Sequence, residues 1–314
     1  MARYVKISSI GPGSYPLDIN IDYPKAVDIM IEHLASELRQ VLSDKPDLIV
    51  LPEACDRPSN YPMKERLEYY KSRGNRVLEF LSSVARDNKC YIAYSAEREA
   101  EDGSWRNSTR IIDRSGEVIG TYNKNHLVIS ETTKDGILCG KDATTIECDF
   151  GRVTCAICFD LNFDELRLKY AKAKPDLILF SSMYHGGLMQ SYWAYSCRSY
   201  FVGCIAGLPN TIISPVGEVI VTGSNYFDYI TETVNLDYCV AHLDENLDKF
   251  KAVKVKYGSK VKIVDPGYLG AVLILSETDE FTIADIIREF EIELLDEYIL
   301  RSLEHRHAPG NIET

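Results

Sequence analysis

The chain alternates short apolar runs with longer stretches in which apolar residues recur at helical spacing, and this alternation restricts its fold more than any other feature. Residues 5–10 are predicted as a first strand, residues 23–42 carry the helical pattern, and residues 47–51 form a short apolar run. A short continuous run predicts a buried strand, whereas the helical spacing predicts an amphipathic helix. Strands that alternate with helices are typical of the α/β fold class.

The same order continues along the chain to residue 222. A hairpin is expected from residues 108–113 and 118–122, with its turn between them. Further strands are predicted at residues 90–94, 152–157, 177–180, 202–206, 211–213 and 219–222, and further helices at residues 67–88, 165–174 and 191–200.

The character of the chain changes near residue 250. Residues 249–262 are rich in lysine, and residues 283–302 form an acidic stretch with amphipathic helical spacing. We therefore predict a main domain over residues 1–249 and a C-terminal extension over residues 250–314, which packs on the main domain or on a partner subunit. An ordinary terminal helix on its own core is the alternative interpretation.

The composition argues against several classes of protein. The formal charge is 35 minus 47, or −12, and no long basic run is present, so nucleic acid is a poor partner. The N-terminus lacks the features of a secretory signal, and no apolar run reaches the roughly 20 residues that span a bilayer. Nine cysteines scattered through 314 residues are not a disulfide scaffold. We expect a soluble, cytoplasmic protein with free thiols and no membrane partner.

Three polar residues follow directly after predicted strands. Glu53 follows the apolar run at 48–51, Lys124 follows the second hairpin strand, and Cys158 follows the strand at 152–157. Sites in open α/β sheets collect at the ends of strands, so these three residues are candidates for a common site. Each one alone has an ordinary explanation: a helix cap for Glu53, a solvated lysine, and a core cysteine.

Cys158 stands on a predicted turn between a strand and a helix. Asn162, with Glu165 three positions later, predicts a capping box at the start of that helix. A cysteine on such a turn faces the N-terminus of the helix, where the dipole and free N–H groups favour a thiolate and an oxyanion. The turn therefore favours a nucleophile.

Other interpretations of the same residues remain open. Cys155 and Cys158 form a C-x-x-C, which in an α/β protein can be a redox pair, although the first cysteine lies inside a predicted strand. A cysteine–histidine pair could use His126 or His185 as its base. A non-catalytic binding protein on the same fold is the third alternative.

Read together, these stretches resemble the nitrilase superfamily of carbon–nitrogen hydrolases. The resemblance covers roughly residues 4 to 245 and includes Asn107 ahead of Lys124. The matching stretches are residues 51–53 (Leu-Pro-Glu), 122–127 (Tyr-Asn-Lys-Asn-His-Leu), 158–167 (Cys-Phe-Asp-Leu-Asn-Phe-Asp-Glu-Leu-Arg) and 214–218 (Ser-Pro-Val-Gly-Glu).

The resemblance implies a four-layer α-β-β-α sandwich and a role for each residue. Cys158 would be the nucleophile, Glu53 the general base and Lys124 the oxyanion stabiliser, with the backbone N–H of Phe159 as a second oxyanion donor. Glu131 resembles a second glutamate that some members place near the attacked carbon. The implied reaction is hydrolysis of a small-molecule amide through a cysteine thioester, in a homodimer or larger homo-oligomer without metal or organic cofactor.

The sequence indicates the type of reaction more clearly than it indicates the substrate. Cys158-Phe159-Asp160 is similar to the amidase and ω-amidase branches, but Asn162 replaces an arginine that ω-amidase-like members often carry. The resemblance therefore does not extend to a dicarboxylic monoamide substrate. Hydrolysis of N-carbamoyl amides is the second candidate activity and nitrile hydrolysis the third. The candidate pocket residues follow the strand after the nucleophile: Tyr184, His185 and Trp193, with a core position as the alternative for Trp193.

Overall fold

The computed structural model describes residues 1–313, which form two compact units. The larger unit comprises Val5–Thr233, and the smaller comprises Met1–Tyr4 with the described residues from Val234 onward. The division lies ahead of the boundary expected at residue 249, because β13 (Tyr238–His242) pairs with β15 (Ala271–Ser276), a strand of the extension. The expected packing of residues 250–314 stays a prediction.

Two six-stranded sheets form the centre of the larger unit. In each sheet three neighbouring strands are parallel, β1-β2-β3 and β7-β8-β9, and the outer strands of the sheet continue it with mostly antiparallel pairs. The first sheet has the order β12 (Tyr229–Asn235), β1 (Tyr4–Ile10), β2 (Leu48–Val50), β3 (Tyr91–Glu99), β4 (Trp105–Ile112), β5 (Val118–Asn123). The second has the order β11 (Val219–Thr222), β10 (Thr211–Ile213), β9 (Tyr200–Ile205), β8 (Leu177–Ser182), β7 (Gly151–Ile157), β6 (Thr145–Cys148).

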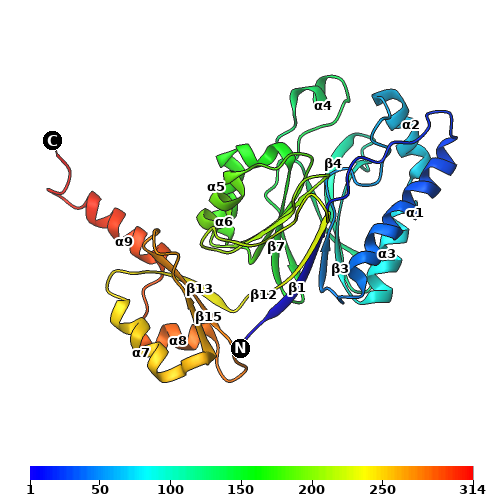
Figure 1. The fold of residues 1–314 in the computed structure, drawn as a ribbon. Coiled ribbons are helices and arrows are strands. Elements are labelled where there is room, and N and C mark those ends of the chain that lie inside the picture. Colours follow the sequence, from blue (N-terminus) through cyan, green and yellow to red (C-terminus); the bar gives the residue numbers. More distant parts are fainter. Residues whose placement is uncertain (314) are drawn as a thin grey trace. The chain divides into compact units, whose positions relative to one another are not determined.

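The two sheets pack face to face between outer layers of helices. Ser181 in β8 donates a hydrogen bond to the carbonyl of Leu51, just after β2, at 2.8 Å. Helices α1 and α3 cover the first sheet, and α5 and α6 cover the second (Figure 1). This confirms the predicted α-β-β-α sandwich. The helices of this unit are α1 (Tyr23–Leu42), α2 (Met63–Arg73), α3 (Arg76–Asn88), α4 (Ile129–Thr133), α5 (Asp164–Ala173) and α6 (Leu188–Cys197), with a 3-10 helix at Cys158–Asn162.

The observed helix boundaries are set by capping residues and by residues with positive φ, so they do not always agree with the bounds predicted from the apolar pattern. Helix α1 has the predicted bounds, and the Asp22 side chain caps it by accepting from the Lys25 N–H. The predicted helix at 67–88 is wrong in its continuity, because Gly74 adopts a positive φ that separates α2 from α3. The predicted helix at 191–200 begins and ends three residues earlier, since Arg198 is left-handed and Tyr200 starts β9.

The smaller unit has its own three-stranded antiparallel sheet and apolar core. The strand order is β13, β15, β14 (Val261–Val264), and the helices are α7 (Leu247–Tyr257), α8 (Ile283–Phe290) and α9 (Leu295–His307), with a 3-10 turn at Gly258–Lys260. The predicted helical stretch at 283–302 is two helices, because Glu291 turns left-handed after α8. Within residues 1–313, no helix has the length and apolarity needed to cross a membrane.

Candidate active site

Three chain segments bring the predicted catalytic residues to one end of the two sheets. Glu53 follows β2, Lys124 follows β5, and Cys158 follows β7. Because the parallel strands β2 and β7 belong to facing sheets, their carboxyl ends deliver side chains into the space between those sheets. The three strand ends lie close together: Lys124 forms an ion pair with Glu53, and the charges of both groups shift the pKa of Cys158.

Lys124 lies between two carboxylates. Its ammonium Nζ is 2.9 Å from Oε1 of Glu53 and 3.0 Å from Oε2 of Glu131, and its side chain is 1% exposed. Burial lowers the pKa of Lys124, but Glu53, Glu131 and Cys158 raise it more, so its pKa lies above the ordinary value. The ammonium is therefore a fixed positive charge at neutral pH. The structure thus brings Glu131, which was named only for its resemblance to a second family glutamate, into the cluster.

Asn107 in β4 is a member of this cluster that was named only for its family resemblance. Its amide Nδ2 donates to Oε1 of Glu53 at 2.8 Å and to Oε1 of Glu131 at 3.3 Å. Lys124 bonds the same Oε1 of Glu53, while the Val128 N–H holds Oε2 of Glu131 at 2.7 Å. Among the described residues, nothing donates a hydrogen bond to Oε2 of Glu53. That oxygen is free to accept a proton.

Cys158 is held on a strained backbone at the start of the 3-10 helix. Its φ is +48°, and Ala54, the residue after Glu53, has a φ of +50°. Non-glycine residues in the left-handed region cost of order 1 kcal/mol or more and persist where the surroundings over-determine them, often at functional sites. The strain supports a functional interpretation of both turns.

The thiol of Cys158 is neutral in the free protein. Burial raises its pKa to about 12, the Glu53 carboxylate adds to that effect, and Lys124 opposes it. Hydrogen bonds with the backbone of Met183 and the hydroxyl of Ser182 also favour the thiolate, although they do not outweigh burial. A nucleophilic Cys158 therefore needs a base at the moment of attack, and a free carboxylate oxygen of Glu53 is in the same cluster.

His126 bonds to Asp160 and, in the part of the chain that the structure describes, makes no hydrogen bond to Cys158. Its Nδ1 lies 3.0 Å from Oδ1 of Asp160, which also accepts from the His126 N–H at 2.8 Å, and its ring stacks on Phe163 at 4.0 Å. Oδ2 of the fully buried Asp160 accepts from the hydroxyl of Tyr122 at 2.7 Å. These bonds tie the Lys124 segment to the turn that carries Cys158.

The predicted capping box at Asn162 and Glu165 is wrong. Helix α5 begins at Asp164 with Phe163 as its N-cap, and no side chain caps it. Asn162 instead donates from Nδ2 to the Phe159 carbonyl and to the Tyr184 hydroxyl, both at 3.1 Å. The 3-10 helix at Cys158–Asn162 takes the predicted N-cap residue, whereas α5 itself begins within one residue of its predicted start.

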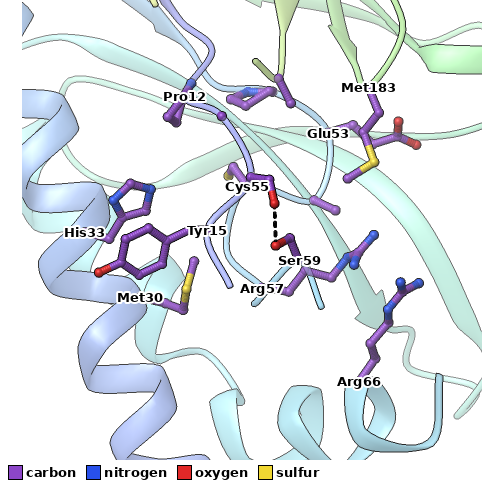
Figure 2. A pocket seen from close by; sticks show the side chains of 15 residues that line it. Pro12, Tyr15, Met30, His33, Glu53, Cys55, Arg57, Ser59, Arg66 and Met183 are labelled. Carbon is purple, nitrogen blue, oxygen red and sulfur yellow. Dashed lines mark hydrogen bonds between the residues drawn. The ribbon is translucent and has the colours of Figure 1, made fainter. Parts of the chain in front are cut away.

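A cavity of about 340 Å³ opens beside Glu53 and Met183. Its walls come from the loop after β1, from α1, from the loop after β2 and from α2, and Figure 2 shows the side chains that line it. Arg57 and Arg66 lie among them, and no sequence pattern distinguishes either one from an ordinary surface arginine. The wall residues therefore come mainly from the first half of the chain.

The three predicted pocket residues are outside that lining. Trp193 is fully buried and its indole N–H donates to the Leu161 carbonyl at 3.0 Å, which is the core position named as its alternative. Tyr184 is half-buried. Burial is the main cause that raises the pKa of its hydroxyl, and Cys158 adds to that effect, so Tyr184 lies near the thiol. His185 accepts from the Gly187 N–H in the loop before α6.

The chain is similar to known proteins over most of its length. A family model described as carbon–nitrogen hydrolase matches residues 7–240. Among curated relatives, a hydrolase of Schizosaccharomyces pombe is 24% identical over 56% of this chain and 62% of its own length. The deaminated glutathione amidase of Homo sapiens is 25% identical over 48% and 50%, and the human omega-amidase NIT2 is 22% identical over 60% and 77%. The matches thus span less than two thirds of the first two relatives.

Solved structures show the same fold at low identity. Nit3 of Saccharomyces cerevisiae, a member of branch 10 of the nitrilase superfamily, aligns with a TM-score of 0.63 and 18% identity, covering 82% of this chain and 97% of that one. An amidase from Nesterenkonia sp. AN1 aligns with a TM-score of 0.59 and 16% identity, covering 74% and 89%. That structure shows covalent addition of the acetamide moiety of fluoroacetamide at the active-site cysteine.

Proposed function

Because the chain belongs to the carbon–nitrogen hydrolase family, the nitrilase superfamily, we propose that it hydrolyses a non-peptide amide of a small molecule through a thioester on Cys158. The observation that carries the proposal is the buried Lys124 ammonium between the carboxylates of Glu53 and Glu131, next to a neutral thiol on a strained turn. The amidase relatives and the cysteine adduct in the Nesterenkonia amidase support the same chemistry.

The first half of the reaction forms the thioester. Oε2 of Glu53 takes the thiol proton while the sulfur attacks the amide carbonyl carbon. The oxygen of the tetrahedral intermediate carries a negative charge, which the Lys124 ammonium and the Phe159 N–H stabilise. Glu53 then gives the proton to the departing nitrogen, the C–N bond breaks, and ammonia or an amine leaves.

The second half releases the acid. Glu53 takes a proton from a water molecule, whose oxygen attacks the thioester carbonyl. The carbon–sulfur bond then breaks, the acid leaves, and the proton returns to sulfur through Glu53. Glu131 holds Lys124 and Asn107 holds Glu53 in position throughout, since the Lys124 ammonium donates to Glu131 and the Asn107 amide donates to Glu53 in the free protein.

Intact-mass measurement during turnover tests the proposal. With a panel of small amides, the protein should gain the mass of one acyl group and release ammonia or amine, and Cys158→Ala should abolish both. Cys139→Ala is the matched control, because Cys139 is an exposed free thiol outside the cluster and its loss should leave the adduct intact.

The same panel separates the rival activities. Carbamoyl amino acids would release carbon dioxide together with ammonia, and nitriles would yield acid without a free amide. A binding protein on this fold would form no adduct with any compound. That last outcome, in folded protein, would overturn the proposed function.

A further inference from the structure

The outer face of the first sheet changes character along strands β3 and β4. Residues directly opposite each other in an antiparallel pair share a face, and the register pairs Tyr94 with Arg110 and Arg98 with Arg106. The Tyr94 ring belongs to the apolar core that also contains residues of α1 and α3. Nearer the turn that joins the two strands, arginines replace the apolar side chains. Three arginines thus lie on one face of two neighbouring strands.

These arginines repel one another. Like charges directly opposite each other on neighbouring strands destabilise a sheet, and Arg98 and Arg106 are such a pair. Arg98 is half-buried, and burial together with the charges of Arg110 and Arg106 lowers its pKa. A guanidinium stays charged at neutral pH even so. A bound anion would relieve this repulsion.

Two of the three arginines have no carboxylate partner within residues 1–313. Arg98 donates hydrogen bonds to two neutral acceptors, Oγ of Ser108 at 3.2 Å and Oδ1 of Asn123 at 3.1 Å. Arg110 makes no hydrogen bond and no ion pair in that range, and its guanidinium lies over the Tyr94 ring, 5.0 Å from the ring centroid. The positive charges of Arg98 and Arg110 are therefore not neutralised by ion pairs.

The acidic side chains nearby do not supply the missing counter-charge. Asp102 lies 3.6 Å from Arg106 and is mostly exposed to solvent. Glu101 and Asp102 raise the pKa of Arg98, but less than burial and the other arginines lower it. Glu99 borders the same space and is exposed, and among the described residues it forms no ion pair with either unpaired arginine. An anion from outside the chain can therefore add a counter-charge that the fold lacks.

Arg98 and Arg110 line a cavity of about 240 Å³, which shares no wall residue with the cavity beside Glu53. Asn75 also lines it, as the N-cap of α3, and no side chain caps that helix. The positive end of the dipole of α3 therefore has the same sign as the two guanidinium groups. Trp105 supplies an aromatic wall.

Two other cations line this cavity, and each already has a counter-charge. The Lys71 ammonium pairs with Glu68 at 2.8 Å, and the Arg73 guanidinium pairs with Asp56 at 2.7 Å. The charge available to a ligand thus comes from the two unpaired arginines.

We propose that Arg98 and Arg110 form a binding site for a phosphate group, on the outer face of the first sheet and apart from the catalytic cluster. Two guanidinium groups match a phosphate monoester, which carries a charge of about −1.5 to −2 at pH 7 and accepts from paired N–H donors. A single carboxylate would leave one of the arginines without a counter-charge. The volume of about 240 Å³ limits the ligand to inorganic phosphate or a small phosphorylated molecule. This inference does not depend on the proposed hydrolysis.

Isothermal titration calorimetry of the full chain tests the site with inorganic phosphate, glycerol 3-phosphate and phenyl phosphate. At about pH 7.5 and low salt, at least one probe should bind with a Kd below about 1 mM, and acetate should bind at least about 10-fold more weakly. At about pH 5.5 phenyl phosphate should bind more weakly, because its second pKa lies near 6 and the monoanion then predominates. Equal affinities assign free phosphate, and tighter binding of an organic probe assigns a phosphorylated molecule.

Arg110→Met is the decisive variant, because Arg110 makes no polar contact in the described chain whose loss would destabilise the fold. It should raise the Kd about 10- to 100-fold, and Arg98→Met should act in the same direction. Arg39→Met is the matched control, since Arg39 is an exposed arginine of α1 outside the cavity. Arg66→Met removes a cation from the cavity beside Glu53 instead. Both controls should change the Kd less than about 2-fold.

Three outcomes would overturn the inference. They are no binding of any probe up to about 10 mM, binding that Arg110→Met leaves unchanged, and equal weakening by Arg110→Met and Arg66→Met. The last outcome would place the anion in the cavity beside Glu53. Amide turnover by Arg110→Met should equal that of the wild type, so failure of the phosphate site leaves the proposed hydrolysis standing.

Discussion

Glu53 and Asp56 lie three residues apart in one loop, yet each belongs to a buried charged cluster of a different kind. Glu53 shares Lys124 with Glu131, beside a cavity and a thiol. Asp56 is fully buried and pairs with Arg73 at 2.7 Å. We call these the Lys124 cluster (Glu53, Lys124, Glu131 and Asn107) and the Arg73 cluster (Asp56, Arg73, Tyr69 and Tyr94).

In the Arg73 cluster the three guanidinium nitrogens of Arg73 and both tyrosine hydroxyls have acceptors, while Oδ1 of Asp56 is buried without a partner. Oδ2 of Asp56 accepts from Arg73 and from the Tyr94 hydroxyl, and the Asp56 carbonyl accepts from Tyr69 at 2.5 Å. Arg73 also donates to the Glu97 carbonyl at 2.8 Å. The Lys124 cluster also leaves one carboxylate oxygen, of Glu53, without a donor, but Glu53 lines the cavity and acts on a thiol that must lose its proton. The clusters therefore differ in access to the cavity: only the open oxygen of Glu53 borders it and can exchange a proton with a bound molecule, whereas the enclosed Asp56 holds the loop in place.

The largest expected effect is on activity, in the Lys124 cluster. Glu53→Gln should reduce kcat/KM for a small amide about 10³-fold, equivalent to about 4 kcal/mol, because it removes the base but keeps an oxygen for Lys124. The free energy of unfolding should change by less than about 1 kcal/mol. Kinetics on the best amide and urea denaturation measure the two quantities. Retained activity would contradict the role of Glu53.

The corresponding carboxylate-to-amide substitution in the Arg73 cluster should affect stability strongly and activity only weakly. Asp56→Asn should lower the free energy of unfolding by about 3 kcal/mol, since it leaves the buried Arg73 without a counter-charge. The kcat/KM per folded molecule should fall less than about 10-fold. Denaturation curves, with activity normalised to the folded fraction, test this. A large activity loss without destabilisation would erase the distinction between the clusters.

A smaller effect on activity is expected for Glu131. Glu131→Gln keeps a hydrogen-bond acceptor for Lys124 but removes one of its two counter-charges, so kcat/KM should fall about 10- to 100-fold, or about 1.4 to 2.7 kcal/mol. In parallel assays, the loss of kcat/KM should be smaller for Glu131→Gln than for Glu53→Gln. A greater loss would make Glu131 the base in place of Glu53.

The last prediction concerns the thiol pKa and sharpens the electrostatic argument. The Glu53 carboxylate helps to raise the pKa of Cys158 to about 12, so removing that negative charge in Glu53→Gln should lower it. The thiolate absorbance near 240 nm, taken as the difference from Cys158→Ala, should then rise at lower pH than in the wild type. An unchanged titration curve would mean that burial alone sets this pKa.

The sequence predicted positions correctly for residues that come directly after a strand. Glu53, Lys124 and Cys158 each come just after an apolar run, and α1 has the predicted bounds because Asp22 and the apolar spacing agree. It failed where the backbone turns without a local signal. The split between α2 and α3 at Gly74 and the 3-10 helix that displaced the Asn162 capping box are examples.

The sequence by itself determined the alternation of strands and helices and which three reactive side chains stand at strand ends, because these depend on neighbours along the chain. Only the tertiary structure decided that Asn107 and Glu131 join them, that Trp193 is core, and that Arg57 and Arg66 share a cavity. Those contacts join distant segments, and their formation depends on how two sheets pack, a property that local patterns do not carry.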